Sequence, residues 1–283
     1  MFLTGPAVVR DALGEEVGVA ELGGPRVHDR NGVCHLVAPS DLDALLLTRE
    51  LLDYLPQRAG ERPADWPGVA APGEAPDLTV PQQERKVYDV RDVARAIVDG
   101  GRLLEISPRY ARNVVCAFAR IEGRPVGAVA NQPQSMAGTL DIAASQKGAR
   151  FVAFCDAFNL PLITLVDTPG FMPGKDLEWR GMIRHGAQLV FAYAEATVPR
   201  VCLIMRKAFG GAYIVMDSKQ MGNDLCLAWP STQVAVTGEP GTVQILHRQE
   251  DPATKAGIIE ASRRPTSPRT SPRRGPQARQ RPL

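Results

Sequence analysis

Residues 201–216 read VCLIMRKAFGGAYIVM and combine an apolar run, two glycines and a second apolar stretch. The run at 201–205 has the length and composition of a buried strand. Gly210 and Gly211 then mark a turn into the first turn of a helix. The first amides of a helix have no partner inside the helix and carry a partial positive charge, so this segment predicts a backbone site for an anion.

The glycines set what such a site could do chemically. Because glycine lacks a Cβ atom, it accepts positive φ and lets a ligand approach the main chain, while Ala212 keeps the next position small. Amides placed in this way stabilise an oxygen that becomes negatively charged during a reaction, by on the order of 3 kcal/mol per donor. The structural alternative is that the glycines only let a helix pack closely on a sheet.

The rest of the chain alternates strand and helix patterns. Helices are predicted near 7–13, 41–54, 90–98, 140–158 and 181–196, and strands near 114–120, 125–130, 162–166, 201–205 and 233–237. This alternation predicts an α/β layer fold. Six prolines between positions 56 and 81 interrupt it and predict a linker.

Composition narrows the function classes. Seven arginines follow Glu260 with no acid among them, so the net charge of +2 leaves −5 on the remainder of the 283 residues. That remainder shows no basic patch for nucleic acid, and no apolar run approaches the ~20 residues that span a bilayer. The five cysteines occur singly, mostly inside apolar segments, which favours reduced packing cysteines and a cytoplasmic protein.

Five segments together resemble one family. They are 162–174 (LITLVDTPGFMPG), 183–187 (IRHGA), 196–200 (ATVPR), 206–216 and 227–230 (LAWP). They resemble the carboxyltransferase (β) subunit of biotin-dependent acyl-CoA carboxylases, of the propionyl-CoA and acetyl-CoA carboxylase type, from about Phe2 to about Asp251. The resemblance implies an α/β fold of the crotonase-like class, a superhelix of ββα units.

The same resemblance implies a domain plan. Residues 1–55 match the last part of the family's N-terminal carboxyltransferase domain, most of which we therefore expect to be absent. Residues 56–82 form the linker, and 83–260 match the C-terminal carboxyltransferase domain. The stretch 261–283 consists almost wholly of Arg, Pro, Ser, Thr, Gln and Gly, so we expect a disordered tail.

Family chemistry implies roles for particular residues. The backbone of Gly211 and Ala212 corresponds to the hole that receives the ureido oxygen of carboxybiotin. A second hole for the acyl-CoA thioester lies upstream of the segment matching Phe2 and is not in this sequence. Further substrate-binding residues are Gly210, Tyr213, Ile214, Phe171 and Lys207. An apolar Ile214 suggests a short acyl group, acetyl or propionyl, although it could equally just pack the helix.

The implied cofactor is biotin, carried as carboxybiotin on a partner's carrier domain, and no metal is expected. The implied partners are acyl-CoA, a biotin carboxylase or biotin carrier subunit, and further copies of the chain in a homo-oligomer in which N- and C-terminal domains face each other, a hexamer in relatives. Two other functions stay open. One is a catalytically incomplete remnant that only folds or oligomerises, and the other is a biotin-dependent acyl-CoA decarboxylase subunit.

Several other residues suggest weaker roles. Arg206, like Lys207, could attract a carboxylate or a CoA phosphate or could simply be solvated, and His185 could act as a general base, although the family chemistry does not need one. Asp167-Thr168-Pro169-Gly170 matches a GTPase element, but no phosphate-binding loop precedes it. His28, Cys34 and His35 lack the regular spacing of a zinc site.

Overall fold

The computed structural model describes residues 1–58, 60–72, 80–81, 83 and 86–262. Part of the predicted linker and all of the predicted tail beyond position 262 therefore lie outside the described residues. Four helices precede the linker, and they are α1 (Pro6–Leu13), α2 (Val19–Gly23), α3 (Pro25–His28) and α4 (Asp41–Asp53). The Ser40 side chain caps α4 by accepting a hydrogen bond from the Asp43 amide at 3.2 Å. The helices predicted near 7–13 and 41–54 are thus confirmed.

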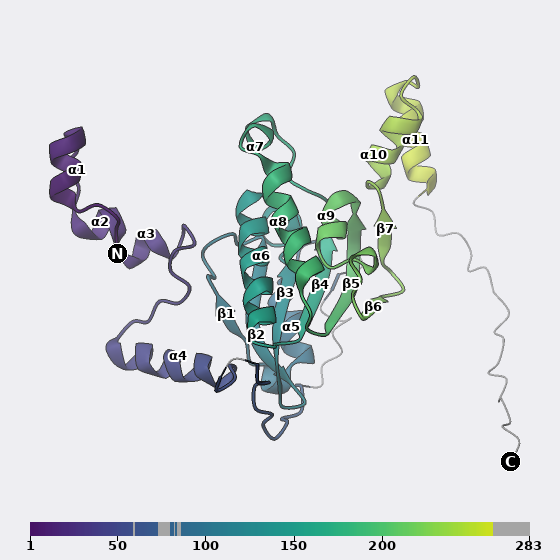
Figure 1. Cartoon of the computed structure of the whole chain (residues 1–283). Helices are drawn as coiled ribbons and strands as arrows, with labels where there is room; N and C mark the ends of the chain where they lie inside the picture. The colour runs from purple at the N-terminus through teal and green to yellow at the C-terminus, as the bar shows by residue number, and fades with distance from the viewer. Residues whose placement is uncertain (59, 73–79, 82, 84–85, 263–283) are drawn as a thin grey trace, which may run out of the picture. The chain divides into compact units, whose positions relative to one another are not determined.

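One mixed sheet organises the described residues that follow (Figure 1). Its strands are β1 (Leu104–Ile106), β2 (Val114–Ile121), β3 (Arg124–Asn131), β4 (Leu162–Thr168), β5 (Arg200–Phe209), β6 (Leu225–Ala228) and β7 (Gln233–Ala235). The first three pair antiparallel, and β3, β4, β5 and β6 pair parallel in that order. β7 also pairs parallel with the end of β5, so β5 is bonded to β4 along one edge and to β6 and β7 along the other.

Helices cover both faces of this sheet. Figure 1 shows α6 (Ile142–Ala157), α8 (Met182–Glu195) and α9 (Gly210–Val215) on one face and α5 (Val90–Ile97) on the other. Successive strand residues point to opposite faces, so Cys116 and Val129 belong to the cluster under α6 and α8, whereas Val115 and Ala130 pack with Val93 of α5. Both faces are apolar because both are covered.

The fold agrees with the predicted alternation and adds elements to it. Strands β1 and β6 and helix α7 (Lys175–Trp179) were not predicted, and β5 continues to Phe209, four residues beyond the predicted end at 205. The described residues 237–262 belong to a unit separate from residues 1–236 and hold α10 (Glu239–Leu246) and α11 (Pro252–Ser262). Among the described helices, none combines the length and apolarity that a bilayer crossing requires.

Candidate anion-binding turn

Strand β5 passes into helix α9 without an intervening loop. Phe209 is both the last residue of the strand and the N-cap of the helix, with extended φ of −109° and ψ of 135°. Gly210 then adopts a φ of +59°, and a Cβ atom at this position would lie 2.9 Å from the Val236 carbonyl oxygen. Only glycine meets both conditions without strain, so the sequence dictates the sharp turn from strand to helix.

The amides of Gly211 and Ala212 follow this turn at the start of α9. As the second and third residues of α9, they have no carbonyl four residues back within the helix to accept their hydrogen bonds, and among the described residues no bond from either amide to a turn or loop is found. Gly211 is exposed, whereas Ala212 is fully buried. Donors at the start of a helix suit an anionic oxygen supplied from outside, and the exposed Gly211 is the more accessible of the two positions.

The aromatic ring of Phe171 lies beside these donors. A Cβ atom added to Gly211 would be 3.4 Å from the Cε2 atom of Phe171, and one added to Gly186 in α8 would be 3.2 Å from its Cζ atom. The ring therefore fills the space between two positions that carry no side chain. Backbone hydrogen bonds hold its segment in place, from the Leu140 amide to the Gly170 carbonyl at 3.1 Å and from the Met172 amide to the Leu140 carbonyl at 2.8 Å.

A buried ion pair supports the strand that carries the turn. The Asp167 carboxylate accepts hydrogen bonds from the Tyr88 hydroxyl at 2.9 Å, from Arg206 Nε at 3.0 Å and from the Lys207 amide at 3.1 Å. Burial, followed by the charge of Asp167, raises the pKa of the Tyr88 hydroxyl, so the phenol stays protonated and donates. Asp167 therefore joins the ends of β4 and β5.

The interpretation of Arg206 as an attractor for a substrate anion is wrong. Its side chain is buried against Asp167, and the Nη1 atom also donates to the carbonyl oxygens of Pro81, Gln83 and Lys86. Most of the five N–H donors of its guanidinium group are thus used in hydrogen bonds within the protein. Asp167 is likewise buried in structural hydrogen bonds. The GTPase-like segment 167–170 is therefore explained by its structural role, and no bound nucleotide is needed to explain it.

The remaining sequence-predicted residues lie around the turn. Tyr213 and Lys207 are half-buried, and Ile214 is 46% exposed, so its side chain is accessible rather than part of the core. His185 is engaged with α6, where its Nδ1 atom lies 3.1 Å from the Nε2 atom of Gln146. The structure thus brings Phe171 to Gly211 and leaves Ile214 accessible close by in the same helix.

Sequence reasoning missed two contributors. Gly186 makes room for Phe171, and the glycine within the IRHGA segment was a signal that could have revealed a close approach to this helix. The pair of Arg200 and Asp217, 2.6 Å apart and buried, joins the start of β5 to the chain just after α9. No local sequence pattern predicts this ion pair, because the two side chains meet only when the strand and the helix pack together.

Two amides of a helix start at the end of a parallel strand, beside an aromatic ring, define a protein with a candidate oxyanion-binding turn. The chain belongs to the carboxyl transferase domain family, whose profile matches residues 1–279. It is 48% identical over 277 residues to the propionyl-CoA carboxylase beta chain of Saccharopolyspora erythraea, covering 93% of this chain and 51% of that relative. It is 44% identical to the methylmalonyl-CoA decarboxylase subunit alpha of Veillonella parvula, covering 89% and 50%.

Solved structures agree with this assignment. The transcarboxylase 12S hexamer with methylmalonyl-CoA and methylmalonic acid bound superimposes with a TM-score of 0.88 at 46% identity, covering 93% of this chain and 52% of that one. The fold is therefore of the crotonase-like class, as the resemblance implied. The chain spans about half the length of the relatives that it matches.

Proposed function

We propose that the chain contributes the biotin side of a carboxyltransferase site, in which CO2 passes from carboxybiotin to the α-carbon of a short acyl-CoA such as acetyl-CoA or propionyl-CoA. The observation that carries this proposal is the position of the Gly211 and Ala212 amides in the first turn of α9, where the helix provides no partner four residues back. Family membership supports the reaction class, because relatives include propionyl-CoA carboxylase beta chains and a methylmalonyl-CoA carboxyltransferase subunit.

Biotin, when it is presented carboxylated on a partner's carrier, supplies the CO2 and a ureido oxygen on which negative charge develops. The residues of this chain fit that group, since Gly211 is exposed and its amide and that of Ala212 lie in the first turn of α9, where a helix leaves donors without an intrahelical partner. Their N–H groups would donate to the oxygen as its charge grows, and each is worth on the order of 3 kcal/mol in such a role. Phe171 would support the turn and help exclude water from one side.

The acyl side of the site rests on fewer residues of this chain. The accessible apolar side chain of Ile214 favours a short apolar acyl group over a charged one, and Lys207 and Tyr213 would border the ligand. In this proposal the thioester hole comes from another carboxyltransferase half, in a homo-oligomer whose N- and C-terminal domains face each other. A biotin carboxylase or biotin carrier subunit would be the second partner, in the cytoplasm.

A decarboxylase is an alternative that the comparisons do not favour, since the methylmalonyl-CoA decarboxylase subunit is 44% identical and the propionyl-CoA carboxylase beta chain 48%. Both candidates use the same turn and differ in the fate of the CO2. A third alternative is a remnant that folds without turning over substrate.

The test is a matched pair of substitutions at one position. Gly211→Pro deletes the amide donor at a place in the first helical turn where proline is tolerated, whereas Gly211→Ala keeps the donor and adds a methyl group 3.4 Å from Phe171. The assay is methylmalonyl-CoA-dependent carboxylation of free biotin, with and without a separately supplied N-terminal carboxyltransferase half. Circular dichroism melts check that both variants fold.

We expect Gly211→Pro to lower the rate roughly 100-fold or more and Gly211→Ala to retain most of it. Equal rates for the two variants would show that this amide is not the oxyanion donor. Absence of turnover even with the added half would instead favour the remnant, and CO2 release from methylmalonyl-CoA without carboxylation of an acceptor acyl-CoA would favour the decarboxylase.

A further inference from the structure

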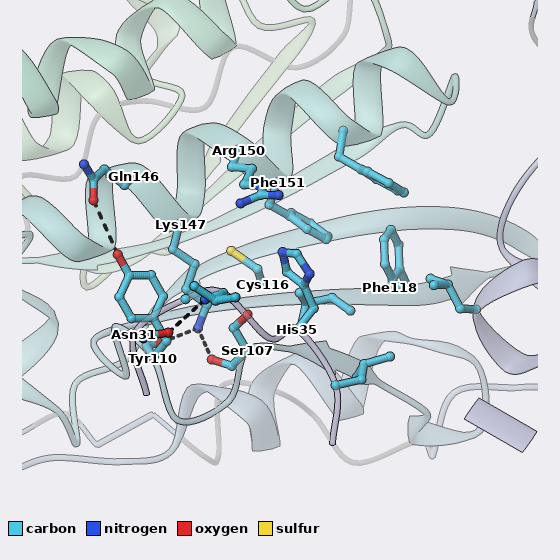
Figure 2. A pocket seen from close by; sticks show the side chains of 16 residues that line it. Asn31, His35, Ser107, Tyr110, Cys116, Phe118, Gln146, Lys147, Arg150 and Phe151 are labelled. Atoms are coloured by element: carbon cyan, nitrogen blue, oxygen red, sulfur yellow. Dashed lines mark hydrogen bonds between the residues drawn. The ribbon is translucent and has the colours of Figure 1, made fainter. Parts of the chain in front are cut away.

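A second candidate site lies away from the turn. An open cavity of about 700 Å³ is lined by residues of α6, of β1 and β2, and of the segment at residues 31–36 (Figure 2). Gly211 and Ala212 do not line it. Its volume falls within the range of about 300–1,000 Å³ typical of small-molecule sites.

One part of this cavity is an apolar wall. The ring centroid of Phe118 lies 5.1 Å from that of Phe151 and 5.6 Å from that of Phe154, and Leu36, Leu51 and Ile106 extend the same surface. A ligand on this wall would contact only aliphatic and aromatic carbon atoms. An extended hydrocarbon chain therefore suits it, at a gain of roughly 0.8 kcal/mol per methylene group removed from water.

The deepest cation of the cavity is closed to ligands. The Lys147 ammonium donates three hydrogen bonds to the carbonyl oxygens of Ser107, Tyr110 and Val114, at 3.0, 3.0 and 2.8 Å. An ammonium has three donors and no acceptor. Lys147 is thus saturated, and a ligand anion must be bound by another group.

Arg150 is that group. It projects from α6 beside Phe151, as Figure 2 shows, and it is exposed. Within the described part of the chain no carboxylate pairs with its guanidinium, and none of the residues that line the cavity is acidic. His35 lines the cavity as well, and burial, followed by the charge of Arg150, lowers the pKa of its imidazole, so it is neutral near pH 7 and can share a hydrogen bond.

We propose that this cavity binds an amphipathic carboxylate with an aliphatic chain, a fatty-acid anion of medium length. Its carboxylate pairs with the unpartnered guanidinium of Arg150, and its hydrocarbon chain lies along Phe118, Phe151 and Phe154. The guanidinium fork matches two carboxylate oxygens. This site is separate from the Gly211 turn and does not depend on carboxyl transfer.

Calorimetric titration of the full chain tests the proposal, with dodecanoate, decanoate and dodecanol as probes. Dodecanoate should bind, decanoate should bind roughly tenfold more weakly because two methylenes are lost, and dodecanol should bind more weakly than dodecanoate. Arg150→Gln should weaken dodecanoate about tenfold and leave dodecanol unchanged. Arg49→Gln, the same change at an exposed position of α4, should alter neither.

Location is checked with Phe154→Trp, which keeps an aromatic ring in the wall and reports by fluorescence. Its emission should change on addition of dodecanoate in proportion to the calorimetric saturation. Three results would each overturn the proposal, namely no binding of dodecanoate, equal dodecanoate affinity in Arg150→Gln and the wild type, or binding without a response from Trp at position 154.

Discussion

Replacing Lys147 by Met removes a buried charge that organises the connection between β1 and β2. Lys147 is only 7% exposed, and its ammonium reaches three backbone carbonyls between positions 107 and 114. Within that connection Ser107 and Ala111 have positive φ, 50° and 44°, a conformation that non-glycine residues adopt only when their surroundings hold them. The ammonium supplies that constraint.

The expected loss follows from what Met leaves behind. Met has a similar length but no donor, so three carbonyl oxygens lose their shared partner at about 1 kcal/mol each. The gain from no longer burying a charge offsets part of this, since burial already lowers the pKa of the Lys147 ammonium. We expect the free energy of unfolding to fall by about 2 kcal/mol.

Urea denaturation followed by circular dichroism measures this difference. The control is Lys175→Met, at an exposed position where the side chain lies over the Trp179 ring, and we expect it to change stability by less than about 1 kcal/mol. Coincident urea midpoints for the two variants would refute the inference that the three carbonyls need the ammonium.

Three further predictions concern buried groups. Burial raises the pKa of Asp217 to about 6 despite its bond to Arg200, so the folded chain binds this proton more tightly than the unfolded chain. The unfolding free energy should therefore fall, by up to about 3 kcal/mol, as pH rises from 4 through 6, and Asp217→Asn should lack this fall. Asp167→Asn should cost about 3 kcal/mol in urea denaturation, because it leaves the Arg206 charge buried without its counter-charge; an unchanged midpoint would contradict this. With a thiol reagent the native chain should react only at its half-buried cysteines, whereas the buried ones should react after unfolding: Cys34 and Cys226 in the first group, and Cys116, Cys155 and Cys202 in the second.

The sequence predicts the strand-to-helix turn because its signals are local. An apolar run, two glycines and a small residue are adjacent in the chain, and the structure places them in one turn. The end of β5 was predicted too early, at 205, because Arg206 and Lys207 look like residues of a solvated loop. Arg206 is instead buried against Asp167, which lies 39 positions away, and no periodicity encodes a partner at that distance.

Short edge elements were missed for a related reason. β1 has three residues and β6 has four, and β6 is largely exposed, so neither shows the apolar alternation of a longer strand. The support that Gly186 gives to Phe171 and the cavity beside Arg150 also depend on how helices and strands pack. Such features cannot be derived from spacing along the chain, whereas the resemblance to a family placed Phe171 and Gly211 in one site.

Strand β5 is hydrogen-bonded along both edges, and this affects how well the turn at its end stabilises a negative charge. The strand forms hydrogen bonds with β4 along one edge and with β6 and β7 along the other, almost to its last residue. Water around a growing anion must reorient, and that reorganisation opposes the reaction. The N–H dipoles at the end of this strand are held in a fixed direction by its hydrogen bonds. An anion that binds there therefore meets donors that were oriented when the chain folded.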